Sequence, residues 1–148
     1  MSLTVRLDAL AQELSAFISL LEQEADALAA NQADALIPLI EQQESANRRL
    51  AGLWQDLTGA VGLPGATALA GLREQCIGLA PEGWRQVEEL ARHAERMNRL
   101  NSRLIDEQLR RTQAAVQVLR SAAGSRMLYG ADGRMSDLLN PNRSIDSA

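Results

Sequence analysis

The chain contains no lysine, one cysteine and one histidine, and it is poor in the residues that favour β-strands. Valine, isoleucine, phenylalanine, tyrosine, tryptophan and threonine together account for 19 of the 148 residues, which excludes a domain built on a β-sheet. The lone Cys76 excludes an internal disulfide and fits a reducing compartment. With His93 as the single histidine, the chain lacks both an ordinary zinc site and the two Glu-x-x-His motifs of a carboxylate-bridged metal centre. We expect Cys76 to be a small core residue and His93 an ordinary flank residue.

Long hydrophobic runs are also missing. No apolar stretch approaches the roughly eighteen residues that a bilayer requires, so we expect no membrane span, no signal peptide and a cytoplasmic protein. The net charge of −4 and the lack of aromatic residues among the arginines argue against nucleic-acid binding. Gly59, Gly62 and Gly65 have no preceding strand and no following lysine, so they do not form a phosphate loop. We therefore expect no cofactor, no metal and no enzymatic activity.

Leucine and alanine dominate instead, with 24 residues of each, and both favour helices. The chain begins with a heptad pattern, which predicts a helix over about 3–30 with these residues on one face: Leu3, Leu7, Leu10, Leu14, Phe17, Leu21 and Leu28. Glu24 interrupts that face. The sequence thus predicts an all-α antiparallel bundle of three to four helices with long coiled-coil-like arms.

Turn residues near position 30 predict a hairpin, with Asp34 capping a second helix and Pro38 at the edge of its first turn. One long kinked helix is the alternative. The second helix is expected to end before Gly59 and to carry these residues on one face: Leu36, Ile40, Gln43, Asn47, Leu50, Trp54 and Leu57. Glycine and proline breaks then delimit a short helix over 66–77 and a long one over 81–123. The bundle is expected to span 1–123, followed by a flexible tail over 124–148.

The second half of the long helix carries a stripe at helical spacing that can anchor a partner helix: Ile105, Leu109, Thr112, Val116, Leu119 and Ala123. The same residues can instead belong to the core. Asn98, Asn101 and Gln108 are polar residues on this helix that can set its register or hold a ligand.

Charge is distributed unevenly. Residues 1–44 carry a net charge of −7 and residues 85–126 a net charge of +4. Opposite charges help to set orientation, so this predicts that the first and last helices are neighbours. A charged face for a foreign partner is the alternative.

The tail is rich in glycine, serine, asparagine and aspartate, yet residues 127–129 and 135–139 are too apolar for a purely solvating tail. Such segments can become ordered on a partner or pack onto the bundle.

Over nearly its whole length the chain resembles the FlgN-type flagellar export chaperones. The resemblance lies in residues 21–28, in the helix over 34–53, in the run Asn-Arg-Leu-Asn-Ser-Arg-Leu-Ile at 98–105, and in the Tyr-Gly-Ala-Asp-Gly motif at 129–133. The last two segments are the most specific. Ser102 departs from the family, which often has a glycine there.

This resemblance implies a cytoplasmic chaperone that binds the C-terminal helical region of the hook-associated proteins FlgK and FlgL. It implies that the chaperone prevents their premature assembly and delivers them to the export gate. The cargo-binding region of the family maps onto these residues: Ile105, Leu109, Thr112, Val116, Leu119, Ala123, Met127 and Leu128. Tyr129 corresponds to the tail tyrosine that contacts the export gate protein FlhA.

Two other functions remain open at this point. A generic coiled-coil scaffold or adaptor would form its own oligomer and have no affinity for flagellar cargo. A ligand-binding bundle would hold a small molecule among Asn98, Asn101 and Gln108. An incompletely covered apolar stripe is equally consistent with a homodimer and with a cargo complex.

Overall fold

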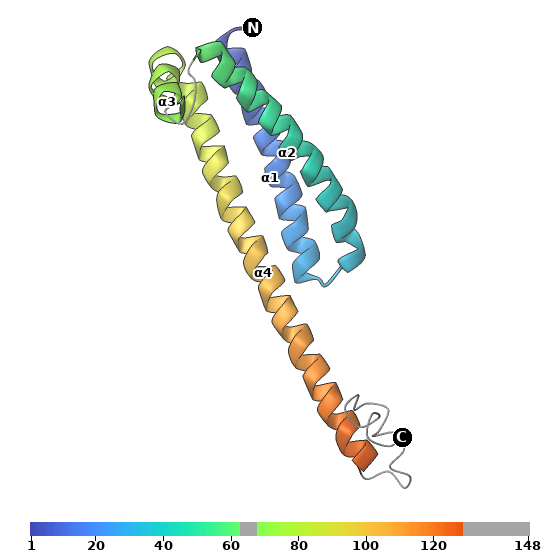
Figure 1. The fold of residues 1–148 in the computed structure, drawn as a ribbon. Coiled ribbons are helices and arrows are strands. Elements are labelled where there is room, and N and C mark those ends of the chain that lie inside the picture. The colour runs from blue at the N-terminus through green and yellow to red at the C-terminus, as the bar shows by residue number, and fades with distance from the viewer. Residues whose placement is uncertain (63–67, 129–148) are drawn as a thin grey trace, which may run out of the picture. The chain divides into compact units, whose positions relative to one another are not determined.

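The computed structural model describes residues 1–62 and 68–128, with the side chains of residues 68, 69 and 125–128 outside the description. Within these ranges the chain forms four helices and no strand (Figure 1): α1 (Leu3–Ala29), α2 (Ala33–Val61), α3 (Ala68–Leu79) and α4 (Pro81–Leu128). The predicted all-α fold is confirmed. The chain divides into two compact units at residues 105 and 106, inside α4, and each is described by itself.

A tight turn joins α1 to α2, so the predicted hairpin is confirmed over the single kinked helix. Asn31 adopts a φ of 54°, a left-handed conformation that asparagine tolerates better than most residues. The N–H of Gln32 donates to the carbonyl of Ala27 at 2.9 Å and closes the turn. The prediction that Asp34 caps α2 is wrong, because the helix starts at Ala33 and Asp34 lies in its first turn. A carboxylate there still interacts favourably with the helix dipole.

The core of residues 1–105 is built around α1, which contributes to two clusters of buried side chains. The first cluster brings all four helices together and contains Leu7, Leu10, Ala11, Leu14, Leu57, Leu72, Cys76, Trp84 and Val87. The second consists of Phe17, Ile18, Leu21, Ala46 and Ala94. Figure 1 shows α1, α2 and the first half of α4 side by side, with α3 next to the start of α4. Apolar packing along α1 therefore holds the bundle together.

The predicted proximity of the first and last helices is confirmed within this unit, but ion pairs do not carry it. Asn101 of α4 donates a hydrogen bond to the carbonyl of Leu21 in α1. Among the described residues, the ion pairs that cross between helices instead join Glu13 to Arg49, from α1 to α2, and Arg73 to Glu88, from α3 to α4.

The buried face of α2 matches the predicted one in part, since Leu57 is buried and these residues are half-buried: Leu36, Gln43, Leu50 and Trp54. Leu39, Ala46 and Leu57 are buried, whereas Ile40 and Asn47 are exposed. Ala46 is fully buried because α1 and α4 approach it closely. Our prediction gave weight to large side chains and passed over Ala46, a small residue that packs against α1 and α4.

Several helix ends also differ from the prediction. α2 continues past Gly59 to Val61 and ends where Gly62 adopts a left-handed φ of 71°. One glycine inside a helix costs about 1 kcal/mol, which a long packed helix tolerates. α3 (Ala68–Leu79) ends two residues beyond the predicted end at 77, its predicted start at 66 lies outside the described residues, and α4 continues to Leu128 rather than ending at 123.

Candidate protein-binding surface on α4

The apolar residues predicted to anchor a partner are exposed on α4. Ile105 is 47% exposed, Leu109 53%, Val116 43% and Leu119 68%. Thr112 is also exposed, and Ala123 is partly buried. In residues 106–122 the structure exposes every side chain except Gln108, which is partly buried. The stripe is therefore available in this chain rather than used in its core.

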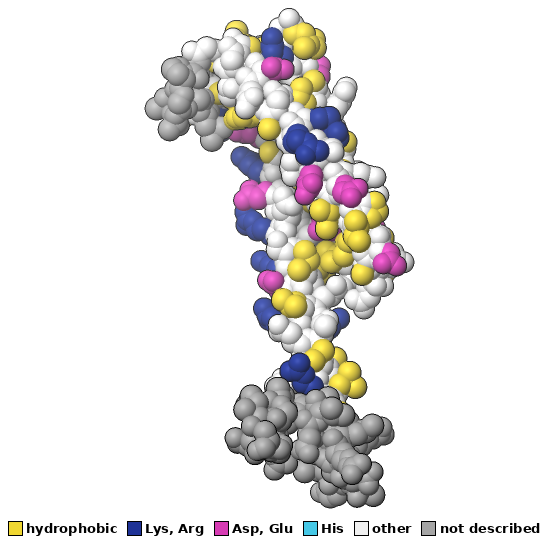
Figure 2. Space-filling model, turned by 45° about the vertical axis from the view of Figure 1, so that its right-hand side comes forward, with side chains coloured by type: hydrophobic (Ala, Val, Ile, Leu, Met, Phe, Trp, Pro, Cys, Tyr) yellow, Lys and Arg dark blue, Asp and Glu magenta, His cyan; other side chains and the backbone are white. Residues whose placement is uncertain are grey.

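The helix geometry places these residues on one face. Leu109, Thr112, Val116, Leu119 and Ala123 are separated by steps of three and four residues. At about 100° per residue, such steps return to the same side of a helix. Figure 2 shows hydrophobic side chains next to arginines on the surface of α4. The surface can receive an amphipathic helix from another protein.

Val118 was missed by the sequence analysis, although it is 67% exposed. It lies one residue before Leu119 and so points about 100° away from the stripe. A search for a single heptad row cannot find it, whereas a search for a second row alongside the first would.

Three predicted site residues have side chains outside the described part of the chain. The backbone of Met127 and Leu128 belongs to α4, but their side chains lie outside the described residues. Tyr129 lies outside the described residues altogether. Their roles stay predictions.

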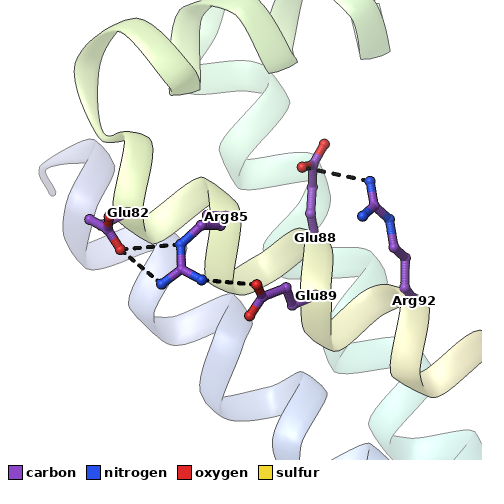
Figure 3. A network of polar contacts seen from close by, with 5 residues as sticks. All are labelled: Glu82, Arg85, Glu88, Glu89 and Arg92. Atoms are coloured by element: carbon purple, nitrogen blue, oxygen red, sulfur yellow. Dashed lines mark hydrogen bonds and ion pairs between the residues drawn. The ribbon is translucent and has the colours of Figure 1, made fainter.

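Arginines along α4 fall into two groups. Near its start, Arg85 is bonded to both Glu82 and Glu89, at 3.0 and 2.9 Å, and Arg92 approaches Glu88 (Figure 3). The hydrogen bonds that Arg85 donates to Glu82, the charge of Glu82 and the neighbouring Glu89 raise the pKa of Arg85. Further along, Arg110, Arg111 and Arg120 are exposed and form no ion pair within the described part of the chain. The exposed stripe thus lies among arginines whose charge the described chain leaves unpaired.

The polar residues of α4 do not converge on a ligand site. Asn101 is 3% exposed and its Nδ2 donates to the carbonyl of Leu21 at 2.9 Å. Asn98 is exposed, and Gln108 is partly buried. The arrangement favours a role for Asn101 in helix register over ligand binding.

A second polar contact joins the hairpin helices. The Gln43 amide of α2 donates to the carboxylate of Glu24 in α1, which is 9% exposed. Glu24 interrupts the apolar face of α1, so this pair explains the interruption. It also fixes which residues of α1 and α2 face each other.

The described residues provide neither a metal site nor a membrane-spanning helix. They contain no cluster of histidine, cysteine and acidic side chains that could hold a metal ion. No helix among them is long and apolar enough to span a membrane. Cys76 is fully buried, as predicted, and this burial raises the pKa of its thiol. His93 is partly buried.

Comparison with known proteins gives one match. A family model described as FlgN protein matches residues 1–137 and so covers all four helices. The comparison with curated proteins and the comparison with solved structures each found no significant match.

Proposed function

The chain belongs to the FlgN protein family, which implies a role as a flagellar export chaperone, and from this premise we propose its cargo and its binding surface. The cargo is the C-terminal helical region of the hook-associated proteins FlgK and FlgL. The surface is the exposed stripe of α4, from Ile105 to Ala123, continued by Met127 and Leu128. The protein acts in the cytoplasm, as a binding protein rather than an enzyme.

The observation that carries this proposal is the exposure of the stripe. Leu109 and Leu119 are 53% and 68% exposed although they share one helical face. An aligned row of exposed apolar side chains is costly in water and is typical of a helix that binds another helix. Covering this row with the cargo helix would also hide the apolar face through which the cargo assembles, and so prevent premature assembly.

The tail has a separate role in the proposal. The residues that follow α4, 129–148, contribute to cargo binding, and Tyr129 contacts the export gate protein FlhA. A segment that becomes ordered on binding loses part of its interaction energy to conformational entropy. This moderates affinity and suits a chaperone that must release its cargo at the gate.

Isothermal titration calorimetry of the full chain with the C-terminal segments of FlgK and FlgL tests the proposal. Leu109→Glu should weaken binding roughly tenfold or more, because a carboxylate is forced against an apolar helix. Gln117→Glu introduces the same charge at an exposed position about 100° around α4 from Val116, away from the stripe, and should leave the affinity nearly unchanged.

Removal of residues 125–148 should weaken cargo binding and abolish binding of FlhA. Absence of binding to both segments by the unmodified chain would reject the chaperone assignment of this surface. A stable oligomer in light scattering, together with that result, would identify a scaffold instead.

A further inference from the structure

Two adjacent rows of exposed residues run along α4, not one. The first row is the stripe described above, within the second unit: Leu109, Thr112, Val116, Leu119 and Ala123. The second row consists of the residues that immediately precede four of these: Arg111, Ala115, Val118 and Ala122. All four are exposed, and three of the four are apolar. The residues that follow the first row form a third row of Gln113, Gln117, Arg120 and Gly124, which contains no apolar anchor.

The width of the apolar surface follows from this arrangement. Neighbouring rows are rotated by about 100° around the helix, so the first and second rows together cover roughly half of its circumference. A helix that packs against a single neighbour needs a stripe only about 100° wide. A surface of twice that width is typical of a helix that contacts two neighbours at once, as in a bundle.

The side chains of the second row suit close packing. Ala115 and Ala122 are small, so a helix can approach the backbone of α4 between them, and Val118 supplies an anchor that is 67% exposed. Arg111, the first residue of the row, is exposed and has no ion pair among the described residues. A partner helix on this row would therefore carry an acidic residue opposite Arg111.

We propose that α4 binds two adjacent helices of its cargo, one on each row, so that residues 109–123 become the third helix of a bundle formed with the cargo. The helix on the first row is anchored by large apolar side chains. The helix on the second row packs closely over Ala115, Val118 and Ala122 and offers an acidic side chain to Arg111. This inference rests on the proposed function, since it assumes that the exposed surface of α4 receives the cargo.

Three consecutive residues provide a matched test. Gln117→Glu, Val118→Glu and Leu119→Glu introduce the same side chain at neighbouring positions on the third, second and first rows. All three positions are exposed in the free chain, so the folded structure should be retained, which circular dichroism checks. Two probes are titrated by calorimetry: a peptide cut to a single helix of the C-terminal helical region of FlgK, and full-length FlgK.

Leu119→Glu should weaken the binding of both probes roughly tenfold or more. Val118→Glu should weaken the binding of full-length FlgK to a similar degree and leave the binding of the single-helix peptide unaffected. Gln117→Glu should change neither affinity by more than about twofold, as expected of an exposed position outside the contact.

The outcomes separate this inference from the proposed function. If Leu119→Glu leaves both affinities unchanged, the proposed cargo surface is wrong. If Leu119→Glu weakens binding while Val118→Glu binds full-length FlgK normally, the surface stands and the second helix is rejected. An equal effect of Val118→Glu on both probes would also reject it, because one helix would then cover both rows.

Two other occupants of the second row are tested with the same variant. If the effect of Val118→Glu disappears once residues 129–148 are removed, the chain's own tail covers the row. If Val118→Glu lowers the mass of the free protein in light scattering, a second copy covers it. Either result overturns the inference.

Discussion

At Asn101 a polar side chain is enclosed in the bundle with only part of its hydrogen-bonding capacity used. Its Nδ2 donates to the carbonyl of Leu21, but its Oδ1 is buried without a partner among the described residues. An unsatisfied buried acceptor costs about 1–3 kcal/mol, and an apolar side chain of similar volume avoids this cost. The residue thus trades stability for a defined register of α4 on α1.

We predict that Asn101→Leu raises the free energy of unfolding by about 1 kcal/mol, because the orphaned oxygen is removed and the volume is kept. Urea denaturation of the full chain measures this. Asn101→Asp is the control and should destabilise the protein, since it buries a charge. A less stable Asn101→Leu variant would mean that the amide contributes more through its bond to Leu21 than its oxygen costs.

Glu88 links α4 to α3 through an ion pair that depends on pH. The hydrogen bond from Arg73 holds the pKa of Glu88 below its ordinary value of 4.5, opposed by desolvation and assisted by the charges of Arg73 and Arg92. Because the folded-state pKa is lowered, the ion pair contributes fully above pH 4.5, and its contribution is lost as the pH falls through the folded-state pKa.

Glu88→Gln should therefore lower the free energy of unfolding by a few tenths of a kcal/mol near neutral pH, as expected of a largely solvated pair. The difference from the unmodified chain should vanish at strongly acidic pH. Chemical denaturation across a pH series measures it. In an Arg73→Gln background the effect of Glu88→Gln should shrink, and an undiminished effect would assign the stabilisation to another group.

Among the helices, two glycines at interior positions differ in what surrounds them. A Cβ added at Gly52 in α2 would meet nothing within 4 Å. A Cβ added at Gly83 in the first turn of α4 would lie 3.2 Å from Cδ1 of Leu7, which is fully buried in the first core cluster. Gly83 thus allows α4 to pack closely against α1, whereas Gly52 only weakens its helix.

Gly52→Ala is expected to stabilise the protein by about 0.5–1 kcal/mol through helix propensity alone. Gly83→Ala is expected to gain less or to destabilise, because Leu7 must shift within a packed core. Thermal denaturation of both variants shows which of the two substitutions stabilises the protein more. A larger gain from Gly83→Ala would show that α4 does not need this close approach.

The sequence predicts where the helices lie in the chain better than it predicts which face of each helix is buried. The heptad of α1 identifies its buried side correctly, since Leu7, Leu10, Leu14 and Leu21 are all buried. On α2 the pattern places Leu57 correctly but misses Ala46, a small residue that packs against α1 and α4. Hydrophobic periodicity records the size and spacing of side chains, but it does not record how near the neighbouring helix comes.

For the molecule as a whole, the sequence locates the candidate surface but not its width. The first row, including Leu109 and Leu119, follows from heptad spacing. The exposure of this row does not follow from the spacing, because residues at the same spacing can also form a buried contact between helices. Val118 was missed because its row begins with Arg111 and otherwise consists of alanines, which favour helix formation and do not by themselves indicate a contact.

The two units should also differ in protection of their backbone amides. Residues 106–122 are exposed almost throughout, and a helix of this length without tertiary packing is marginally stable in water. We predict that hydrogen exchange, followed by mass spectrometry, is faster in 106–122 than in residues 7–21 of α1. Binding of FlgK should slow exchange in 106–122. Equal protection of both segments in the free chain would show that another surface covers this part of α4.

The complete burial of Cys76 has a practical consequence. Thiol-directed reagents attack the thiolate, and this thiol is both inaccessible and shifted toward its protonated form. A cysteine introduced at an exposed position such as Gln117 can therefore carry a fluorophore or spin label without replacement of Cys76. The rate at which the native thiol is modified would then measure how often the bundle opens around α3.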